Sequence, residues 1–287
     1  MATTEVPTRQ RWKTGYGCAP QRGPCSRRGS SDPRWAAAAL WLCLVAAACA
    51  HVPGPSDLRA AQLHYDLAVE AMKAGKVTEA VAELQTALKR NPDFPEAHNA
   101  LGLLYHMSLH RLHKAEAAYR RALELRPNYS EAANNYGALL LELGRYKEAQ
   151  ALFEKALDDV LYPTPYLARG NLGWALYKQG QVDKALEELR MAVVLQPKFC
   201  AGYRNIGIIL EEQGDLTGAL DAYANYAQQC PEVPDAHYRL GQVRQAAGDR
   251  AGALRSYEKC FNLAPKATIG HECAKRYEAL QQVGSAG

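Results

Sequence analysis

The most reactive side chains in this 287-residue sequence are cysteines, of which there are eight. After Cys49 four remain, all in the last third of the chain, and four cysteines can be joined in three ways. Disulfides persist mainly in oxidising compartments outside the cytoplasm. The four residues are Cys200, Cys230, Cys260 and Cys273.

Three histidines, His106, His110 and His113, have the helical spacing i, i+4 and i+7, which could suit a metal ion. No fixed carboxylate or cysteine stands beside them in the sequence, so we expect no metal site. We also find no Ser/His/Asp set, glycine-rich phosphate loop or H-E-x-x-H motif. Glu211 and Glu212 are adjacent and point differently on a helix, so we interpret them as solvated charges. We expect no enzyme and no cofactor.

The positive charge is concentrated at the N-terminus. Residues 1–48 carry seven Lys or Arg and two acidic residues, so the net charge of +4 leaves the rest of the chain at −1. Because the chain after residue 48 is nearly neutral, we expect no basic surface that would bind nucleic acid. The basic stretch is followed by fourteen apolar residues at 35–48, which is short for a membrane span and typical of a signal peptide.

The small residues before Cys49 resemble a bacterial lipobox, although Ala46 stands where that motif prefers leucine. The resemblance implies that Cys49 is acylated and becomes the new N-terminus. An ordinary cleavage site with a chance cysteine is the alternative. Residues 49–60, rich in Pro and Gly at their start, would be the tether, and Ala50 instead of Asp favours the outer membrane. The long leader leaves the start codon open, and Arg27-Arg28 lacks the apolar residues expected for twin-arginine export.

A repeat of 34 to 36 residues fills the chain after the tether. An apolar residue followed by Ala or Gly recurs at 67, 101, 136, 172, 206 and 240, and an alanine follows each pair after twelve or thirteen residues. A large apolar residue comes four places later. These positions divide the chain into repeats 61–94, 95–129, 130–165, 166–199, 200–233 and 234–267.

This pattern resembles the tetratricopeptide repeat, which implies an all-α, right-handed α-solenoid of six helical hairpins. Small residues would let two antiparallel helices approach closely, and Gly75, Gly144, Gly180, Gly214 and Gly248 would end each first helix. Repeat 2 replaces this glycine with residues 107–113, and repeat 3 has a two-residue insertion within 161–165. Residues 268–287 predict a capping helix and tail.

The repeat positions also predict the disulfides. Cys200 and Cys230 lie at the two ends of repeat 5, which an antiparallel hairpin brings together. Cys260 and Cys273 lie at matching distances from the turn before the capping helix. We therefore predict the pairs Cys200–Cys230 and Cys260–Cys273, with four buried free thiols as the alternative.

The resemblance also implies that the first helix of each hairpin lines a concave groove that binds protein. Asparagines recur at the expected groove positions and could bind an extended peptide backbone through donor and acceptor together. The alternative is that they tie neighbouring helices to each other. The asparagines are Asn99, Asn134, Asn135, Asn171 and Asn205. The apolar floor of the groove would comprise Tyr65, Leu103, Leu141, Trp174, Tyr177, Ile208 and Tyr238.

With a lipobox, six repeats and a cap, residues 49–285 resemble the pilotin lipoproteins of type IV pilus systems, the Tgl/PilF/PilW group. The local marks are residues 161–166, 169–175 and 199–207. The resemblance implies an outer-membrane lipoprotein facing the periplasm that binds secretin subunits and promotes their membrane insertion and multimer assembly. An adaptor for peptidoglycan hydrolases or proteases is an alternative, and the substrate-reading region of a glycosyltransferase is a third. We expect the partner site in the region from repeat 3 to repeat 5.

Overall fold

The computed structural model describes residues 53–283, and the predicted signal peptide and acylated Cys49 lie outside this range. Within it, all regular structure is helical, and the helices follow one another as hairpins. The first three hairpins comprise α2 (Pro55–Lys73) with α3 (Val77–Arg90), α4 (Pro95–Leu103) and its continuation η1 (Leu104–Ser108) with α5 (Leu112–Leu125), and α6 (Ser130–Glu142) with α7 (Tyr146–Leu157). The next three comprise α8 (Pro165–Lys178) with α9 (Val182–Leu195), α10 (Cys200–Glu212) with α11 (Leu216–Gln229), and α12 (Pro234–Ala246) with α13 (Arg250–Leu263). A final helix, α14 (Thr268–Val283), follows them.

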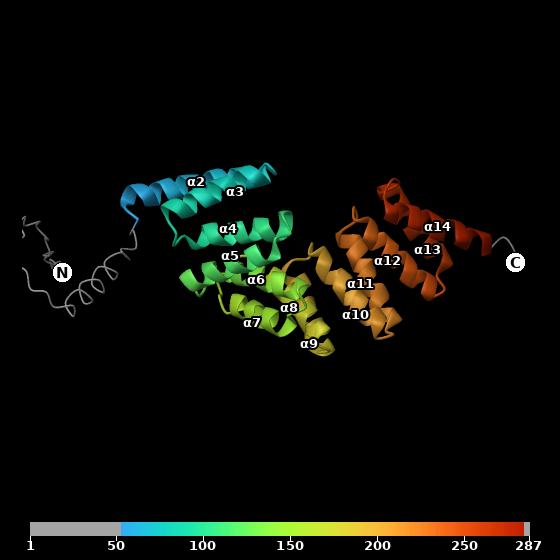
Figure 1. The fold of residues 1–287 in the computed structure, drawn as a ribbon. Coiled ribbons are helices and arrows are strands. Elements are labelled where there is room, and N and C mark those ends of the chain that lie inside the picture. The colour runs from blue at the N-terminus through green and yellow to red at the C-terminus, as the bar shows by residue number, and fades with distance from the viewer. Residues whose placement is uncertain (1–52, 284–287) are drawn as a thin grey trace, which may run out of the picture. The chain divides into compact units, whose positions relative to one another are not determined.

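Each hairpin packs against the next one along the chain. The second helix of one hairpin contacts the first helix of the following hairpin, as α7 does with α8 and α11 with α12 (Figure 1). This arrangement confirms the predicted all-α stack of six hairpins with an additional C-terminal helix. The core is therefore formed between sequence neighbours, as expected for a solenoid.

Glycine makes the turn inside five of the six hairpins. Gly75, Gly144, Gly180, Gly214 and Gly248 all have φ between 70° and 80°, the left-handed region predicted for them. At the first of these turns the Gly75 amide donates to the Met72 carbonyl and the Lys76 amide donates to the Ala71 carbonyl. These bonds satisfy carbonyls at the helix end, so the chain can reverse without leaving them unpaired.

Glycine also permits the close approach of helices within a hairpin. A Cβ added at Gly207 would lie 2.3 Å from Cε1 of Tyr223, and one at Gly173 would lie 2.9 Å from the backbone oxygen of Ala185. The facing alanines, Ala185 among them, are fully buried. The small residues of the repeat are therefore required by the packing of its two helices.

The first helix is longer than the sequence predicted. The tether was expected to extend to residue 60, whereas α2 begins at Pro55. Proline suits the first helical position because it has no amide hydrogen to leave unpaired there, and Asp57 places a negative charge in the first turn. The tether prediction was wrong for residues 55–60, which form helix.

Repeat 2 accommodates its extra residue as a π-helical turn. The Leu109 amide donates to the Leu104 carbonyl, five residues back, and the Arg111 amide donates to the Tyr105 carbonyl. His110 takes the place of the turn glycine, with φ 48°. The extra residue of this 35-residue repeat thus lies at the end of its first helix.

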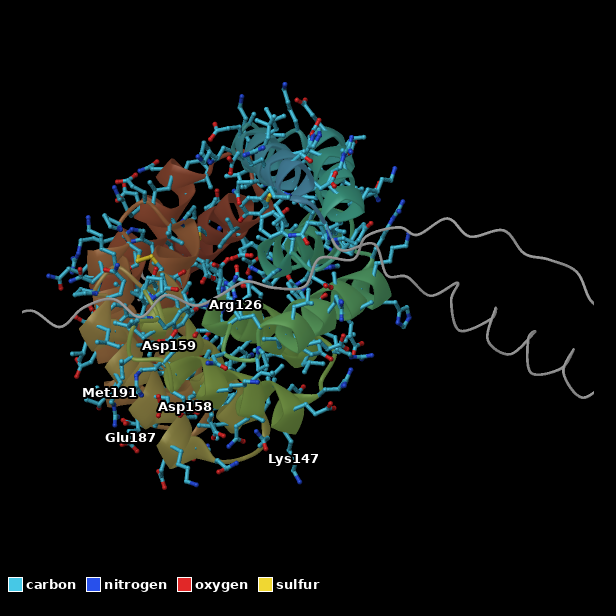
Figure 2. The ribbon with its side chains drawn as sticks, turned by 90° about the vertical axis from the view of Figure 1, so that its left-hand side faces the viewer. Arg126, Lys147, Asp158, Asp159, Glu187 and Met191 are labelled. Carbon is cyan, nitrogen blue, oxygen red and sulfur yellow. A yellow bond between two sulfur atoms is a disulfide. The ribbon has the colours of Figure 1, made fainter. Side chains whose placement is uncertain are left out.

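The insertion in repeat 3 is held by Asp159. Its carboxylate accepts hydrogen bonds from the Ser130 hydroxyl (2.6 Å) and from the Leu161 amide (2.9 Å). Asp158 and Asp159 are labelled on the face shown in Figure 2. Tyr162 is buried with Ala156 and Ala168, so the inserted residues fill the junction between the third and fourth hairpins.

Two disulfides stabilise the C-terminal part of the stack, and both are the predicted pairs. Cys200 and Cys230 join the start of α10 to the end of α11, with 6.0 Å between their Cα atoms. Cys260 and Cys273 join α13 to α14, with 6.1 Å between Cα atoms. The last helix is therefore covalently attached to the hairpin that it covers.

Candidate partner-binding face

The predicted binding residues lie on the first helices of the hairpins. Helices α4, α6, α8 and α10 contact one another in order along the stack. We call the surface formed by these four helices the first-helix face. It carries all five asparagines of the predicted groove and most of its apolar residues.

Hydrogen bonds between asparagines join three neighbouring helices of this face. Asn135 on α6 donates to Asn99 on α4, and Asn171 on α8 donates to Asn134 on α6, each at 3.1 Å. Asn99 also donates to Glu131 at 3.2 Å. These bonds correspond to the alternative interpretation, in which asparagines tie adjacent helices together.

Two of the asparagines cannot form hydrogen bonds to a bound peptide in this structure. Asn99 is 3% exposed and Asn134 is 6% exposed, so a bound chain would not reach their amides. The prediction that they line the groove was wrong, because both side chains are buried and accept hydrogen bonds from asparagines of the next hairpin. Asn135 and Asn171 remain half-buried. Asn205 is also half-buried, and its side chain makes no hydrogen bond within residues 53–283.

An aromatic pair with a cation above it lies on α8. The rings of Trp174 and Tyr177 have centroids 5.0 Å apart, and the Lys178 ammonium lies 4.7 Å and 5.1 Å from the two centroids. The Tyr177 hydroxyl donates to the carboxylate of Glu212 on α10. This bond is the main reason that the pKa of Tyr177 rises to about 12. The hydrogen bond therefore links α8 to α10.

The remaining predicted groove residues have different surroundings. Leu141 on α6 and Ile208 on α10 are half-buried, and Leu141 packs against the main core. Tyr238 on α12 is near the cap, because the Arg276 guanidinium of α14 lies 5.4 Å from its ring centroid. The cap thus partly covers the last hairpin at this point.

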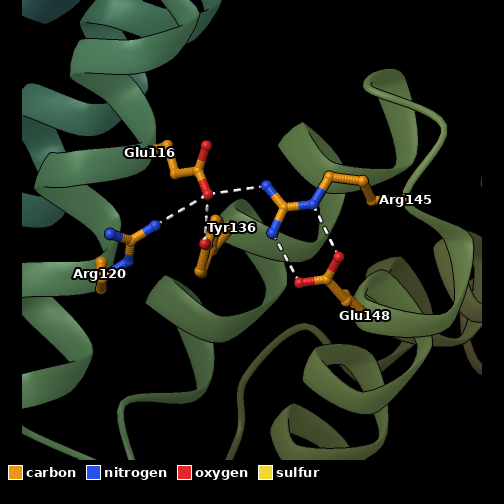
Figure 3. A network of polar contacts seen from close by, with 5 residues as sticks. All are labelled: Glu116, Arg120, Tyr136, Arg145 and Glu148. Atoms are coloured by element: carbon orange, nitrogen blue, oxygen red, sulfur yellow. Dashed lines mark hydrogen bonds and ion pairs between the residues drawn. The ribbon is translucent and has the colours of Figure 1, made fainter.

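A polar network joins the second and third hairpins (Figure 3). Arg145 donates to Glu116 at 2.8 Å and makes two bonds to Glu148, while the Tyr136 hydroxyl donates to Glu116 at 2.9 Å. Arg120 pairs with the same oxygen of Glu116 at 3.0 Å. The Arg145 bond is the main cause that holds the pKa of Glu116 below its ordinary value of 4.5. The sequence pattern did not indicate this network, since its members come from α5, α6, α7 and the residue just before α7.

A surface hollow between α13 and α14, of about 280 Å³, was also not foreseen. Phe261 and Tyr277 form its apolar part, and Glu258 and Glu278 lie at its edge. The sequence carries no signal for it, because it depends on how the cap is seated. Across residues 53–283 there is no group of three His, Cys, Asp or Glu side chains that could hold a metal ion. In the same range no helix is long and apolar enough to cross a membrane.

Protein-family models described as tetratricopeptide repeat match residues 65–130, 137–198 and 171–236, and further models of that description match 118–151 and 235–267. Together these matches span more than half of the chain.

Two of the similar proteins, PilF and PilW, are described as type IV pilus factors. The type IV pilus assembly protein PilF of Pseudomonas aeruginosa is 31% identical over 110 residues, which are 38% of this chain and 43% of PilF, less than two thirds of its length. The crystal structure of PilW, a widely conserved type IV pilus biogenesis factor, has a TM-score of 0.68 and 29% identity, covering 74% of this chain and 97% of PilW. The structure of P. aeruginosa PilF has a TM-score of 0.65 and 22% identity, covering 77% of this chain and 99% of PilF, and shows a shared fold.

Proposed function

Because this chain belongs to the tetratricopeptide repeat family and is related to PilF and PilW, we propose that it is a non-enzymatic assembly factor of a type IV pilus. In this proposal an acyl group on Cys49 anchors the protein to the outer membrane, on the periplasmic side. The first-helix face binds secretin subunits and promotes their membrane insertion and multimer assembly.

One observation carries the proposal: the similarity to PilW extends over nearly the whole of that chain, 97%, at 29% identity. The local chemistry supports it. The neighbouring helices α8 and α10 carry the aromatic pair Trp174 and Tyr177, the apolar Ile208 and Asn205, whose amide has no partner within residues 53–283. An aromatic and apolar surface with one available amide suits an amphipathic segment of a protein partner.

The binding part of the proposal is confined to the residues that the asparagine bonds leave available. We assign the contact to Asn205, Trp174, Tyr177 and Ile208, with Asn135 and Asn171 at its margin. Asn99 and Asn134 are left out because they are buried. The site would therefore lie mainly in the fourth and fifth hairpins.

The proposal is tested by deleting the gene and measuring heat-resistant secretin multimers on a gel. We expect the deletion strain to contain secretin monomers and the wild-type gene to restore multimers. A Trp174→Ala/Asn205→Ala variant should restore them poorly, whereas Met191→Ala, an exposed change on α9 (Figure 2), should restore them fully. Cys49→Ser should reduce multimers by releasing the protein from the membrane. Normal multimers in the deletion strain would contradict the proposal.

A further inference from the structure

The two ends of the hairpin stack differ. At the C-terminal end α14 covers the last hairpin and is joined to it by the Cys260–Cys273 disulfide. At the N-terminal end, within residues 53–283, no helix precedes α2. Solenoids generally end in a unit whose outer face is polar, because an open end would expose the surface that the next repeat covers.

The outer face of α2 exposes leucines at positions that are buried in every other hairpin. Leu67 is 47% exposed, whereas the residues at the equivalent position, Leu101, Tyr136, Leu172, Ile206 and Leu240, are at most 9% exposed. Leu63 is 58% exposed, whereas the residues that correspond to it are buried Ala or Gly, namely Ala97, Ala132, Ala168, Gly202 and Ala236.

These equivalent positions face the preceding hairpin. Ala168 clusters with Ala156 of α7, and a Cβ added at Gly202 would lie 2.5 Å from Val193 of α9. The helix that covers them is the second helix of the preceding hairpin, which runs antiparallel to the first helix that it covers. The outer face of α2 is therefore shaped to receive an antiparallel helix.

The occupant must accommodate leucine where the interior repeats have Ala or Gly. A helix packed as in an interior repeat would lie too close for Leu63, because a leucine side chain fills the space that Ala leaves to its neighbour. A helix that carries leucines of its own can instead interlock with Leu63 and Leu67 at a wider separation.

The charges beside the leucines indicate which helix occupies the outer face of α2. Arg59, Leu63, Leu67 and Glu70 follow at intervals of four, four and three residues, so they form one exposed stripe. When a second copy of the stripe is laid antiparallel on the first, Leu63 meets Leu67 of the other copy and Arg59 meets its Glu70. Arg59 has no ion pair within residues 53–283, and Glu70 pairs only with the exposed Lys73 of its own helix.

We propose that the outer face of α2 is a self-association surface, on which two copies of this protein pair their α2 helices antiparallel about a two-fold axis between Leu63 and Leu67. Such an interface is isologous, since the same stripe contributes from both copies. It would be small, so we expect a dissociation constant of about 1 to 100 μM. This inference does not depend on the proposed pilus function.

The test is sedimentation of the purified protein over a range of concentrations. Arg59→Glu and Glu70→Arg should each weaken dimerisation about tenfold or more, because each places like charges opposite one another. The double variant Arg59→Glu/Glu70→Arg should restore it to nearly the wild-type value. Lys147→Glu, an equal charge change on α7 (Figure 2), should have no effect. Circular dichroism would show that each variant is folded.

Three results would overturn the inference. The wild-type protein could remain monomeric up to about 200 μM, about twice the upper end of the expected range. The double charge exchange could fail to restore an association that each single variant had weakened. Leu63→Ser/Leu67→Ser could leave self-association unchanged and reduce binding to phosphatidylethanolamine vesicles, which would assign the stripe to a membrane surface.

Discussion

Asn99 and Asn205 illustrate how the same residue type acquires opposite roles on the first-helix face. The Asn99 side chain accepts from Asn135 and donates to Glu131, so it is internal to the protein. Asn205 has no such partner in the described part of the chain and is half-buried. The difference arises because the asparagine bonds run from α4 to α8 and stop at Asn171. The sequence alone does not distinguish the two residues, because both are asparagines at predicted groove positions.

We therefore predict that Asn99→Ala lowers the free energy of unfolding by about 1 to 3 kcal/mol, since it leaves buried polar partners unpaired. Asn205→Ala should change it by less than about 0.5 kcal/mol, as is usual where no such network is broken. Urea unfolding followed by circular dichroism measures both. Partner binding should show the reverse order, with Asn205→Ala the more damaging. Equal stability of the two variants would contradict the structural role of Asn99.

At the scale of helices, Glu116 connects three elements through Arg145, Tyr136 and Arg120 (Figure 3). The pKa of its carboxyl is lowered chiefly by the Arg145 hydrogen bond. A carboxyl with a lowered folded-state pKa stabilises the protein fully above its unfolded-state pKa, here near 4.5. That contribution disappears as the pH falls through the lower folded-state value.

The Glu116→Gln variant should accordingly show a weaker dependence of stability on pH. As the pH falls from about 6 to about 3, wild-type stability should decrease more than that of the variant, because only the wild type loses this paired carboxylate. Urea midpoints across this range measure the difference. Glu154→Gln is the control, since it removes an exposed carboxylate of α7 that accepts only from Gln150 within residues 53–283. Identical pH profiles for wild type and Glu116→Gln would refute the assignment.

At the scale of the whole molecule, stability in a stack of hairpins is approximately the sum of terms between neighbours, so the ends decide where opening begins. The C-terminal end is joined by a disulfide that closes a 13-residue separation. The N-terminal hairpin has a neighbour on one side only, within the described residues. The two ends should therefore open to different degrees.

Hydrogen exchange can measure this asymmetry. At protein concentrations too low for self-association, amides of α2 and α3 should exchange faster than those of α13 and α14. A Cys260→Ala/Cys273→Ala variant should accelerate exchange in α14 by about a hundredfold, because a loop of this size contributes about 3 kcal/mol. The Cys200→Ala/Cys230→Ala variant should leave α14 protected. Unchanged exchange in α14 after loss of Cys260 and Cys273 would show that packing alone holds the cap.

What the sequence by itself determined is the local, periodic part of the structure. The turn glycines, the alanines between helices and the cysteines at matching heights all follow from a fixed period, because contacts in a solenoid join segments close in sequence. The fold, the hairpins and both disulfide pairs could therefore be predicted, apart from the start of α2, where Pro55 begins a helix instead of continuing a tether.

Only the tertiary structure decided which side chains are buried by, or hydrogen-bonded to, residues of other helices. Burial of Asn99, the bond from Tyr177 to Glu212 and the convergence of three residues on Glu116 depend on side-chain directions across different helices. Leu67 has the same repeat position as Leu101, yet one is exposed and the other buried. Within residues 53–283 a hairpin precedes Leu101 and none precedes Leu67, a difference that the residue pattern around each leucine does not contain.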